Sequence, residues 1–378
     1  MTERADPLSY WNDQFLDTIR AQLDELTLQF DEKLLPEKSE DLFDAIRRAT
    51  SSEVMNPLVT KLAAEMYPVL IQQAGDIVHD YKEELQQPET VIREIWGKAL
   101  FLLQTFILIS IESGSDTVAH LRAMKLVDHP LSSALVPMHA RCCRIAHELL
   151  VLCQHGYPDG AHARWRTIYE ISITGIFLKQ HDSDVVTRYL EHAAVSARKA
   201  ARSHREHHAR LEEPPPSDEA IAALEERCEE LRRRYGGPFL RTYGWAAAAL
   251  GKKQPTFIDI ERAVGLTHWR PYYYLANLNI HADVRGDQWS LGNPYNKGMQ
   301  LVGPSYLGLA DPVHGAALAL MWITFAVLGI HPTLDVILRQ KILAQLHDEI
   351  RDEVSSAHTR SVDRYREYFR QSQDADHK

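Results

Sequence analysis

Apolar side chains recur at helical spacing along nearly the whole chain, and this feature restricts the fold more than any other. Near the start, large apolar residues follow one another at steps of three or four: Trp11, Phe15, Ile19, Leu23, Leu26 and Phe30. Such steps place side chains on one face of an α-helix. Alternating β-branched runs closed by tight Gly turns, which are typical of β-hairpins, are nearly absent. The sequence therefore predicts an all-α protein, a multi-helix bundle.

The composition is that of an ordinary folded protein. Hydrophobic residues make up 45% and charged residues 25% of the 378 residues, which excludes global disorder. The formal net charge of -10 argues against bulk electrostatic attraction to nucleic acid and leaves room only for a local basic patch. The four cysteines, of which Cys142 and Cys143 are adjacent, suit a reducing compartment. We therefore expect a cytoplasmic protein without a structural disulfide.

The sequence does not indicate a targeting or membrane segment. Residues 1–10 are charged and do not resemble a secretory signal. The apolar run 99–111 is too short to span a membrane and is bracketed by charged residues. The run 313–330 lacks Asp, Glu, Lys and Arg, but it contains His314 and two glycines, and we interpret it as a buried central helix. We expect no membrane partner.

Breaks in the helical pattern predict three parts. We expect an N-terminal helical section at 1–113, a main helical domain at 114–339, and a C-terminal helix with a polar tail at 340–378. The first boundary rests on the turn-forming residues Gly114, Ser115 and Asp116. In the N-terminal section helices are expected at 41–50, 54–85 and 89–112, with the second broken by Pro57 and Pro68. In the main domain they are expected at 131–155, 161–180, 269–283 and 312–330.

Two further segments of the main domain stand out. A third helix, capped by Ser183 or Asp184, becomes strongly polar by residues 204–208, and a new charged helix starts at Ser217 after three prolines. This pair predicts a projecting charged arm. The segment 286–304 is long and rich in Gly, Asn and Pro, so we expect a functional loop.

The C-terminal segment 334–369 keeps helical apolar spacing with polar residues between, and it predicts a long amphipathic helix. Such a surface can pack on the domain or on a second subunit, and we expect a homodimer.

Several common catalytic motifs are missing. The sequence has neither a phosphate-binding Gly-rich loop nor a dinucleotide fingerprint, and it has no Glu-x-x-His pairs for a di-iron centre. Cys-x-x-Cys, His-Glu-x-x-His and nucleophile-elbow patterns are absent as well. We therefore predict no metal site and no cofactor.

Two polar sets fall on predicted helices of the main domain. Arg166 and Glu170 are four residues apart and share a helix face, where they form an ion pair kept for register, serve a ligand, or lie exposed. Tyr274, Asn277 and His281 lie along one stripe. They either satisfy one another within the core or point into a cleft, where His281 acts as an acid or base.

These residues also carry a resemblance. The segment 147–178, with Gly156, Arg166 and Glu170, and the later run YYYLANLNIHADVRG from Tyr272 resemble a bacterial family of helical proteins catalogued only as a domain of unknown function. The resemblance covers about residues 130–330. It implies that Arg166, Glu170, Tyr274 and His281 belong to the family core, and it supplies no reaction.

A weaker likeness is to the HEPN superfamily, helical domains that include RNA-cleaving toxins and phage-defence effectors. Its motif, an Arg followed four to six residues later by His, fits Arg141 with His147 and also two pairs in 198–207. The likeness implies metal-independent RNA cleavage, in which His assists attack of the 2′-hydroxyl and Arg stabilises the developing charge. For the Arg and His residues in 198–207, the alternative interpretation is a solvated helix face.

Three functional hypotheses follow. The first is an intracellular HEPN-like effector that cleaves RNA without a metal, or acts on a nucleotide, in a toxin or phage-defence context. The second is a non-catalytic helical module that binds a partner protein or a small ligand, and the third is a small-molecule enzyme. For the first, the candidate catalytic residues are Arg141, His147, Arg166, Glu170 and His281, and the candidate substrate-binding residues are Tyr274 and Asn277.

Overall fold

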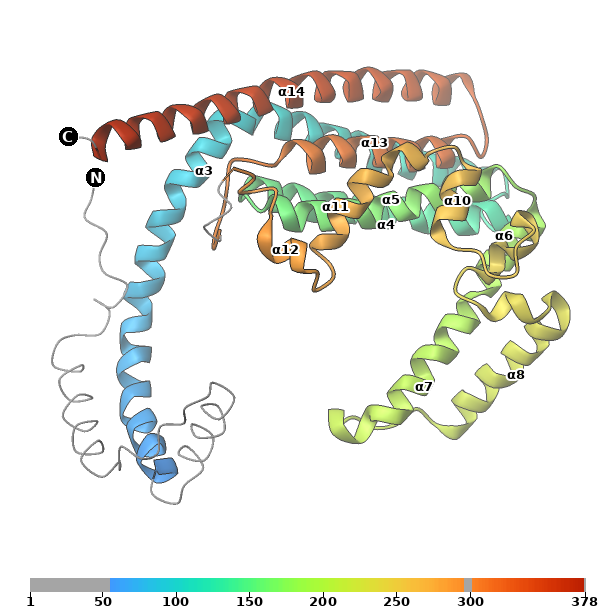
Figure 1. Cartoon of the computed structure of the whole chain (residues 1–378). Helices are drawn as coiled ribbons and strands as arrows, with labels where there is room; N and C mark the ends of the chain where they lie inside the picture. Colours follow the sequence, from blue (N-terminus) through green and yellow to red (C-terminus); the bar gives the residue numbers. More distant parts are fainter. Residues whose placement is uncertain (1–54, 296–300, 377–378) are drawn as a thin grey trace. The chain divides into compact units, whose positions relative to one another are not determined.

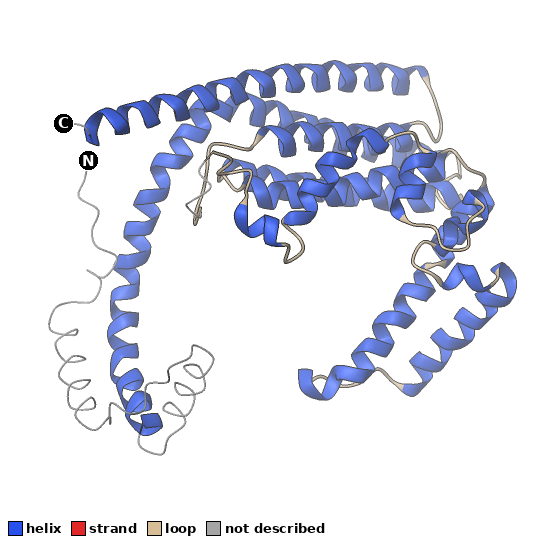
Figure 2. Cartoon of the chain, in the orientation of Figure 1, coloured by secondary structure: helices blue, strands red, loops and turns tan. Residues whose placement is uncertain are grey.

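A computed structural model describes residues 55–295 and 301–376. Within these ranges the chain is helical and has no β-strand, which confirms the all-α prediction (Figure 2). The helices expected at 11–30 and 41–50 lie outside the described residues. Contacts divide the chain into two compact units, residues 1–87 and 88–378. The expected domain boundaries at 113/114 and 339/340 stay a prediction.

Several helix breaks predicted in the N-terminal section are wrong. The helix α3 (Met55–Ala123) runs without interruption through Pro57, Pro68 and the segments 86–88 and 114–116. Pro57 falls in the first turn, where the backbone N–H has no partner within the helix anyway. Pro68 and the segment 114–116 lie inside the helix. Gly114 has a packing role instead of ending the helix: a Cβ there would lie 2.5 Å from Cε1 of His139.

The core of the second unit is a helical bundle. Its central elements are α4 (Pro130–Gln154), α5 (Pro158–Lys179) and α13 (Ala310–Leu328), which pack on one another, and α14 (Leu334–Asp376) packs on α13 (Figure 1). The hairpin of α4 and α5 and the long C-terminal helix agree with expectation. The largest fully buried side chains include Trp96, Trp165 and Phe177. Complete burial of such aromatic side chains stabilises the fold by about 2–3 kcal/mol each.

Two helical segments are long and apolar enough to cross a membrane by length and composition: Met66–Ala123 and Ala310–Leu328. The apolar window of the second is 67% buried, since α13 packs between α4, α5 and α14. Core helices of soluble proteins have the same composition. That the chain meets no membrane, and that it is cytoplasmic, stay predictions.

The charged arm is a hairpin of α7 (Ala193–Leu211) and α8 (Asp218–Tyr235), whose surfaces are mostly exposed (Figure 1). The sequence predicts one continuous helix from about residue 183 to residue 208. The structure divides it into α6 (Ser183–Glu191) and α7, with His192 between them. The cap of α6 is Asp182, one residue before the expected position, because its carboxylate accepts from the backbone N–H groups of residues 184 and 185. Ser217 caps α8 as expected.

Short elements connect the arm to α13: η3 (Gly237–Leu240), η4 (Gly244–Ala246), α9 (Ala247–Leu250), α10 (Phe257–Ala263), η5 (Thr267–Trp269), α11 (Arg270–Leu278) and α12 (Val284–Gln288). The helix expected at 269–283 therefore ends at Leu278. The Asp283 side chain caps α12 by accepting from the N–H of Arg285 at 2.8 Å, which starts a new helix instead of extending the old one. The loop that follows is held to α5, where Asp159 accepts from the N–H of Leu291 at 2.8 Å.

Candidate functional site

Of the alternatives left open for Arg166 and Glu170, the structure shows an ion pair on α5, and Tyr273 of α11 bonds to both groups. Arg166 Nη2 lies 2.9 Å from Glu170 Oε1, and both groups also bond to the hydroxyl of Tyr273. That hydroxyl donates to Glu170 Oε1 at 2.6 Å and accepts from Arg166 Nη2 at 3.0 Å. The Arg166 side chain is 19% and the Glu170 side chain 32% exposed. The pair is therefore partly desolvated, and solvent still reaches it.

A second charged cluster lies deeper, next to the first. The carboxylate of Glu261 is fully buried; Oε1 accepts from the Tyr169 hydroxyl and Oε2 from Arg270 Nη1 at 2.9 Å. The Arg270 guanidinium lies 4.9 Å from the ring centre of Tyr273, and Arg166 lies 4.8 Å from the same ring. Tyr273 is thus the contact through which both arginines meet.

Burial and charge keep the phenols of this network protonated. Burial raises the pKa of Tyr273 to about 12, and the bond to Glu170 acts in the same direction. Burial also raises the pKa of Tyr169, together with its bond to Glu261. The pKa of Arg166 is raised as well, because its bonds to Tyr273 and Glu170 outweigh the opposing effect of burial. At neutral pH Tyr273 therefore keeps its proton and donates a hydrogen bond to Glu170.

The Glu170 side chain lines a cleft, here named the α4–α5 cleft, with a volume of about 390 Å³. Arg141 from α4 and Glu170 from α5 supply its charged groups, and four aromatic side chains are among the other lining residues. The other lining residues are Ser133, Ala134, Pro137, Met138, Thr167, Ile171, Thr174, Tyr189, Leu190, Tyr243, Trp245 and Phe257.

The charges of the cleft act on its tyrosines. Burial raises the pKa of Tyr189, and the positive charge of Arg141 opposes this shift. Burial raises the pKa of Tyr243 too, followed by the negative charge of Glu170, whereas Arg166 opposes it. The two phenols accordingly lie within electrostatic reach of the two charged walls and remain neutral donors.

Two polar groups of the cleft are available to a ligand. Among the described residues Arg141 makes no hydrogen bond or ion pair, and its side chain is exposed. The Glu170 bonds to Tyr273 and Arg166 both end on Oε1, so Oε2 accepts from no other described residue. Within the described part of the chain, a guanidinium without a partner and a carboxylate with one unbonded oxygen therefore belong to residues that line the same cleft.

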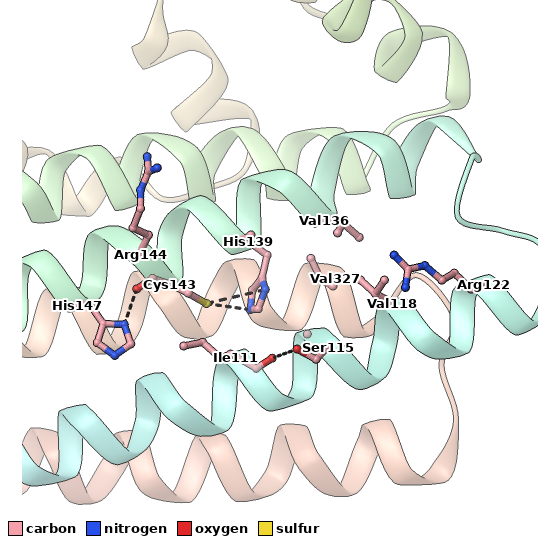
Figure 3. Close-up of a pocket in the computed structure, with 12 residues that line it drawn as sticks. Ile111, Ser115, Val118, Arg122, Val136, His139, Cys143, Arg144, His147 and Val327 are labelled. Atoms are coloured by element: carbon pink, nitrogen blue, oxygen red, sulfur yellow. Dashed lines mark hydrogen bonds between the residues drawn. The ribbon is translucent and has the colours of Figure 1, made fainter.

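The remaining predicted site residues lie elsewhere. His147 is six residues beyond Arg141, a rotation of about 240° around α4, and it lines a separate groove between α3 and α4 (Figure 3). His281 follows the end of α11 and is exposed. Tyr274 is 58% exposed, with Arg270 5.2 Å from its ring centre. The Asn277 Oδ1 atom is buried without a hydrogen-bond partner.

Some residues of the network escaped the sequence analysis. Tyr273 precedes Tyr274 by one position, a rotation of about 100°, and three consecutive tyrosines give no periodic signal that separates them. Other residues lie in the short elements that connect the arm to α13: Glu261 in α10, Trp245 in η4, and Tyr243 directly before η4. Elements of this length are too short for a periodic apolar pattern. The i, i+4 spacing of Tyr273 and Asn277 was the one signal that could have selected Tyr273.

Metal and thiol chemistry gain no support from the described part of the chain. Nowhere in residues 55–295 and 301–376 do three or more His, Cys, Asp or Glu side chains meet in a way that could hold a metal ion. All four cysteines are buried and free. Burial raises the pKa of the Cys142 and Cys143 thiols, the latter to about 12, so neither is a nucleophile at neutral pH.

Fold and cleft define a helical-bundle protein whose two central helices, α4 and α5, line a mainly apolar cleft with two charged side chains. Residues 132–292 match the family described as a family of unknown function (DUF5677), which confirms the resemblance to a helical domain of unknown function over this segment. The matched segment contains every residue that lines the α4–α5 cleft. No curated protein and no solved structure matches the chain. The HEPN likeness is not confirmed by these comparisons.

Proposed function

We propose that this chain is a non-catalytic ligand-binding module, and that the α4–α5 cleft takes a small anion carrying a planar ring, such as a nucleotide. The observation that carries the proposal is Arg141, a guanidinium without an ion-pair partner among the described residues, on the wall of an aromatic-lined cleft. A guanidinium of this kind binds phosphate or carboxylate through two parallel hydrogen bonds.

The other groups of the cleft match the rest of such a ligand. The half-buried ring of Tyr243 offers a face on which a planar base stacks, a contact worth about 1–3 kcal/mol. Glu170 Oε2 accepts from an amino group of the base. The volume of about 390 Å³ falls within the usual range for small-molecule sites.

The ribonuclease hypothesis is supported less well. It needs Arg141 and His147 at one reacting group, whereas these two residues line different cavities. No histidine lines the α4–α5 cleft. Cleavage would therefore need a second chain to bring the two residues together, and the homodimer itself stays a prediction, as do an RNA partner and a role in phage defence.

Binding of nucleoside monophosphates, with inorganic phosphate as the ring-free comparison, tests the proposal by calorimetry. We expect a nucleotide to bind, and Arg141→Gln to weaken its binding by about tenfold or more, the loss of one charged hydrogen-bonding group. Tyr243→Ala should weaken the nucleotide while leaving phosphate unchanged. Arg144→Gln is the matched control, because Arg144 is also exposed on α4 but lines the other groove.

Three results would contradict this proposal. The first is absence of binding for every nucleotide at millimolar concentration, and the second is equal weakening by Arg144→Gln. The third is cleavage of a labelled single-stranded RNA in EDTA that is lost in both Arg141→Gln and His147→Gln, which would establish the ribonuclease instead.

A further inference from the structure

A second and larger cavity, the α3–α4 groove, lies on another face of α4 and shares no residue with the α4–α5 cleft (Figure 3). Its volume is about 640 Å³, and most of its surface is apolar. It is lined by residues of α3, α4 and α13: Ile111, Gly114, Ser115, Val118, Arg122, Val136, His139, Ala140, Cys143, Arg144, His147 and Val327.

The floor of the groove carries no charge at neutral pH. His139 is 5% exposed, and burial lowers its pKa to about 4. Thr324 Oγ1 donates to the carbonyl of Leu320 at 2.7 Å, so it accepts the proton of His139 Nε2 at 3.1 Å. The imidazole is therefore a neutral part of the wall. Gly114 allows it to lie there, because any Cβ at that position would overlap the ring.

Every charged side chain that lines the groove is basic. Arg122 has no ion-pair partner within the described ranges 55–295 and 301–376, and Arg144 is paired loosely with Glu148 at 3.8 Å. His147 Nδ1 donates to the carbonyl of Cys143 at 3.3 Å, which leaves Nε2 free to bond outward. No Asp or Glu lines the groove. The charge pattern selects an anionic group and disfavours a cation.

The groove is elongated along the helices. Figure 3 shows Arg122 and His147 at opposite ends, with valines, Ile111 and His139 between them. On α4 the lining extends from Val136 to His147, eleven helical steps that correspond to about 16 Å. An apolar channel of this length with a basic group at either end fits a single extended alkyl chain that ends in an acid.

We propose that the α3–α4 groove binds a single-chain amphiphilic anion, a medium-chain to long-chain carboxylate, with its alkyl chain along the apolar wall and its carboxylate at Arg122. This groove shares no lining residue with the α4–α5 cleft, so either proposal can fail alone. Burial of the chain supplies the affinity, and the unpaired guanidinium selects the acid over uncharged chains.

Isothermal titration of the full chain with sodium octanoate, decanoate and dodecanoate, all below their micelle concentrations, tests the proposal. Each added methylene should strengthen binding about threefold to fourfold, and dodecanol should bind about tenfold more weakly than dodecanoate. Arg122→Gln should weaken dodecanoate about tenfold and leave dodecanol unchanged. Arg93→Gln, another exposed arginine of α3 outside this groove, is the charge control.

Filling the groove tests the location. Ala140 and Ser115 are exposed lining residues, so Ala140→Trp and Ser115→Phe add bulk to the groove without entering the core. Each should weaken both dodecanoate and dodecanol about tenfold or more, whereas Ala222→Trp on the exposed face of α8 should not. Two filled positions keep the test valid where one variant fails to fold.

Several outcomes would overturn the proposal: equal affinity for dodecanoate and dodecanol, no effect of either filling variant, or loss of the circular dichroism signal on titration, which indicates detergent denaturation. A change of oligomeric state in Ala140→Trp, with unchanged dodecanoate binding, would assign the groove to a second copy of the chain instead. Binding to anionic vesicles but not to free dodecanoate would assign it to a membrane surface.

Discussion

The buried carboxylate of Glu261 offers a sharp test of the network behind the cleft. Both of its oxygens accept hydrogen bonds, from Tyr169 and from Arg270 Nη1, and the side chain is fully buried. Glu261→Gln keeps the shape and replaces one oxygen by an NH₂ group. With its NH₂ group toward Arg270 the amide meets only donors. Turned the other way, it donates to the Tyr169 hydroxyl, whose proton then turns to the carbonyl of Leu266 at 3.3 Å. In both orientations Arg270, 19% exposed, loses its counter-charge.

The expected cost follows from these contacts. A hydrogen bond to a charged group is worth about 1.5–3 kcal/mol, and removal of one partner of a buried ion pair costs about 3–5 kcal/mol. Since the amide retains one acceptor, we expect Glu261→Gln to lower the free energy of unfolding by about 3 kcal/mol. Glu225→Gln is the matched control, because Glu225 pairs with Arg202 on the exposed arm, and it should cost less than about 1 kcal/mol.

Urea unfolding followed by tryptophan fluorescence and circular dichroism measures both values. With an m-value of about 3 kcal/mol/M the Glu261→Gln midpoint should move down by about 1 M. In an Arg270→Gln background the same substitution should cost at least about 1 kcal/mol less, because the charge it strands is gone. A midpoint shift no larger than that of Glu225→Gln, or full additivity with Arg270→Gln, would refute the reasoning.

Three further predictions concern pH, packing and capping. Burial lowers the pKa of His139, His162 and His314 to about 4, so between this value and about 6.5 the unfolded chain binds protons that the folded chain does not. The free energy of unfolding should therefore fall as the pH drops from about 6.5 to about 4. In His139→Gln the urea midpoint should depend less on pH across this range. Gly114→Ala should lower the free energy of unfolding by about 1–3 kcal/mol, because the added Cβ overlaps His139. Gly75→Ala on the same helix meets nothing within 4 Å and should raise it by up to about 1 kcal/mol. Shifts of the thermal midpoint in the same direction for both variants would contradict the packing argument. Ser217→Ala should cost about 1 kcal/mol and speed amide exchange at the start of α8 relative to the start of α5, where no side chain caps the helix.

The helices of the bundle could be predicted because the signals that form them are local. Periodic apolar residues, proline near helix starts and the Ser217 cap act within a few residues of one another, and α4, α5, α8, α13 and α14 followed from them. The pairing of Arg166 with Glu170 is local for the same reason, since it spans one helical turn. Prediction of breaks was weaker. Pro68 and the segment 114–116 lie inside α3, where packing of the whole helix outweighs their local preference.

The composition of the candidate site depended on tertiary structure. That Arg141 shares a cleft with Glu170 and not with His147 is decided by the rotational orientation of α4 between α3 and α5, since neighbouring positions on a helix differ in direction by about 100°. The choice of Tyr273 over Tyr274 as the partner of Arg166 depends on the same rotation, set by the packing of α11 on α5. Local patterns in the amino-acid sequence were enough to predict most of the helices and their polar faces. Only packing between segments far apart in the chain decided which polar faces share one cleft, because contacts of that kind leave no periodic pattern in the sequence.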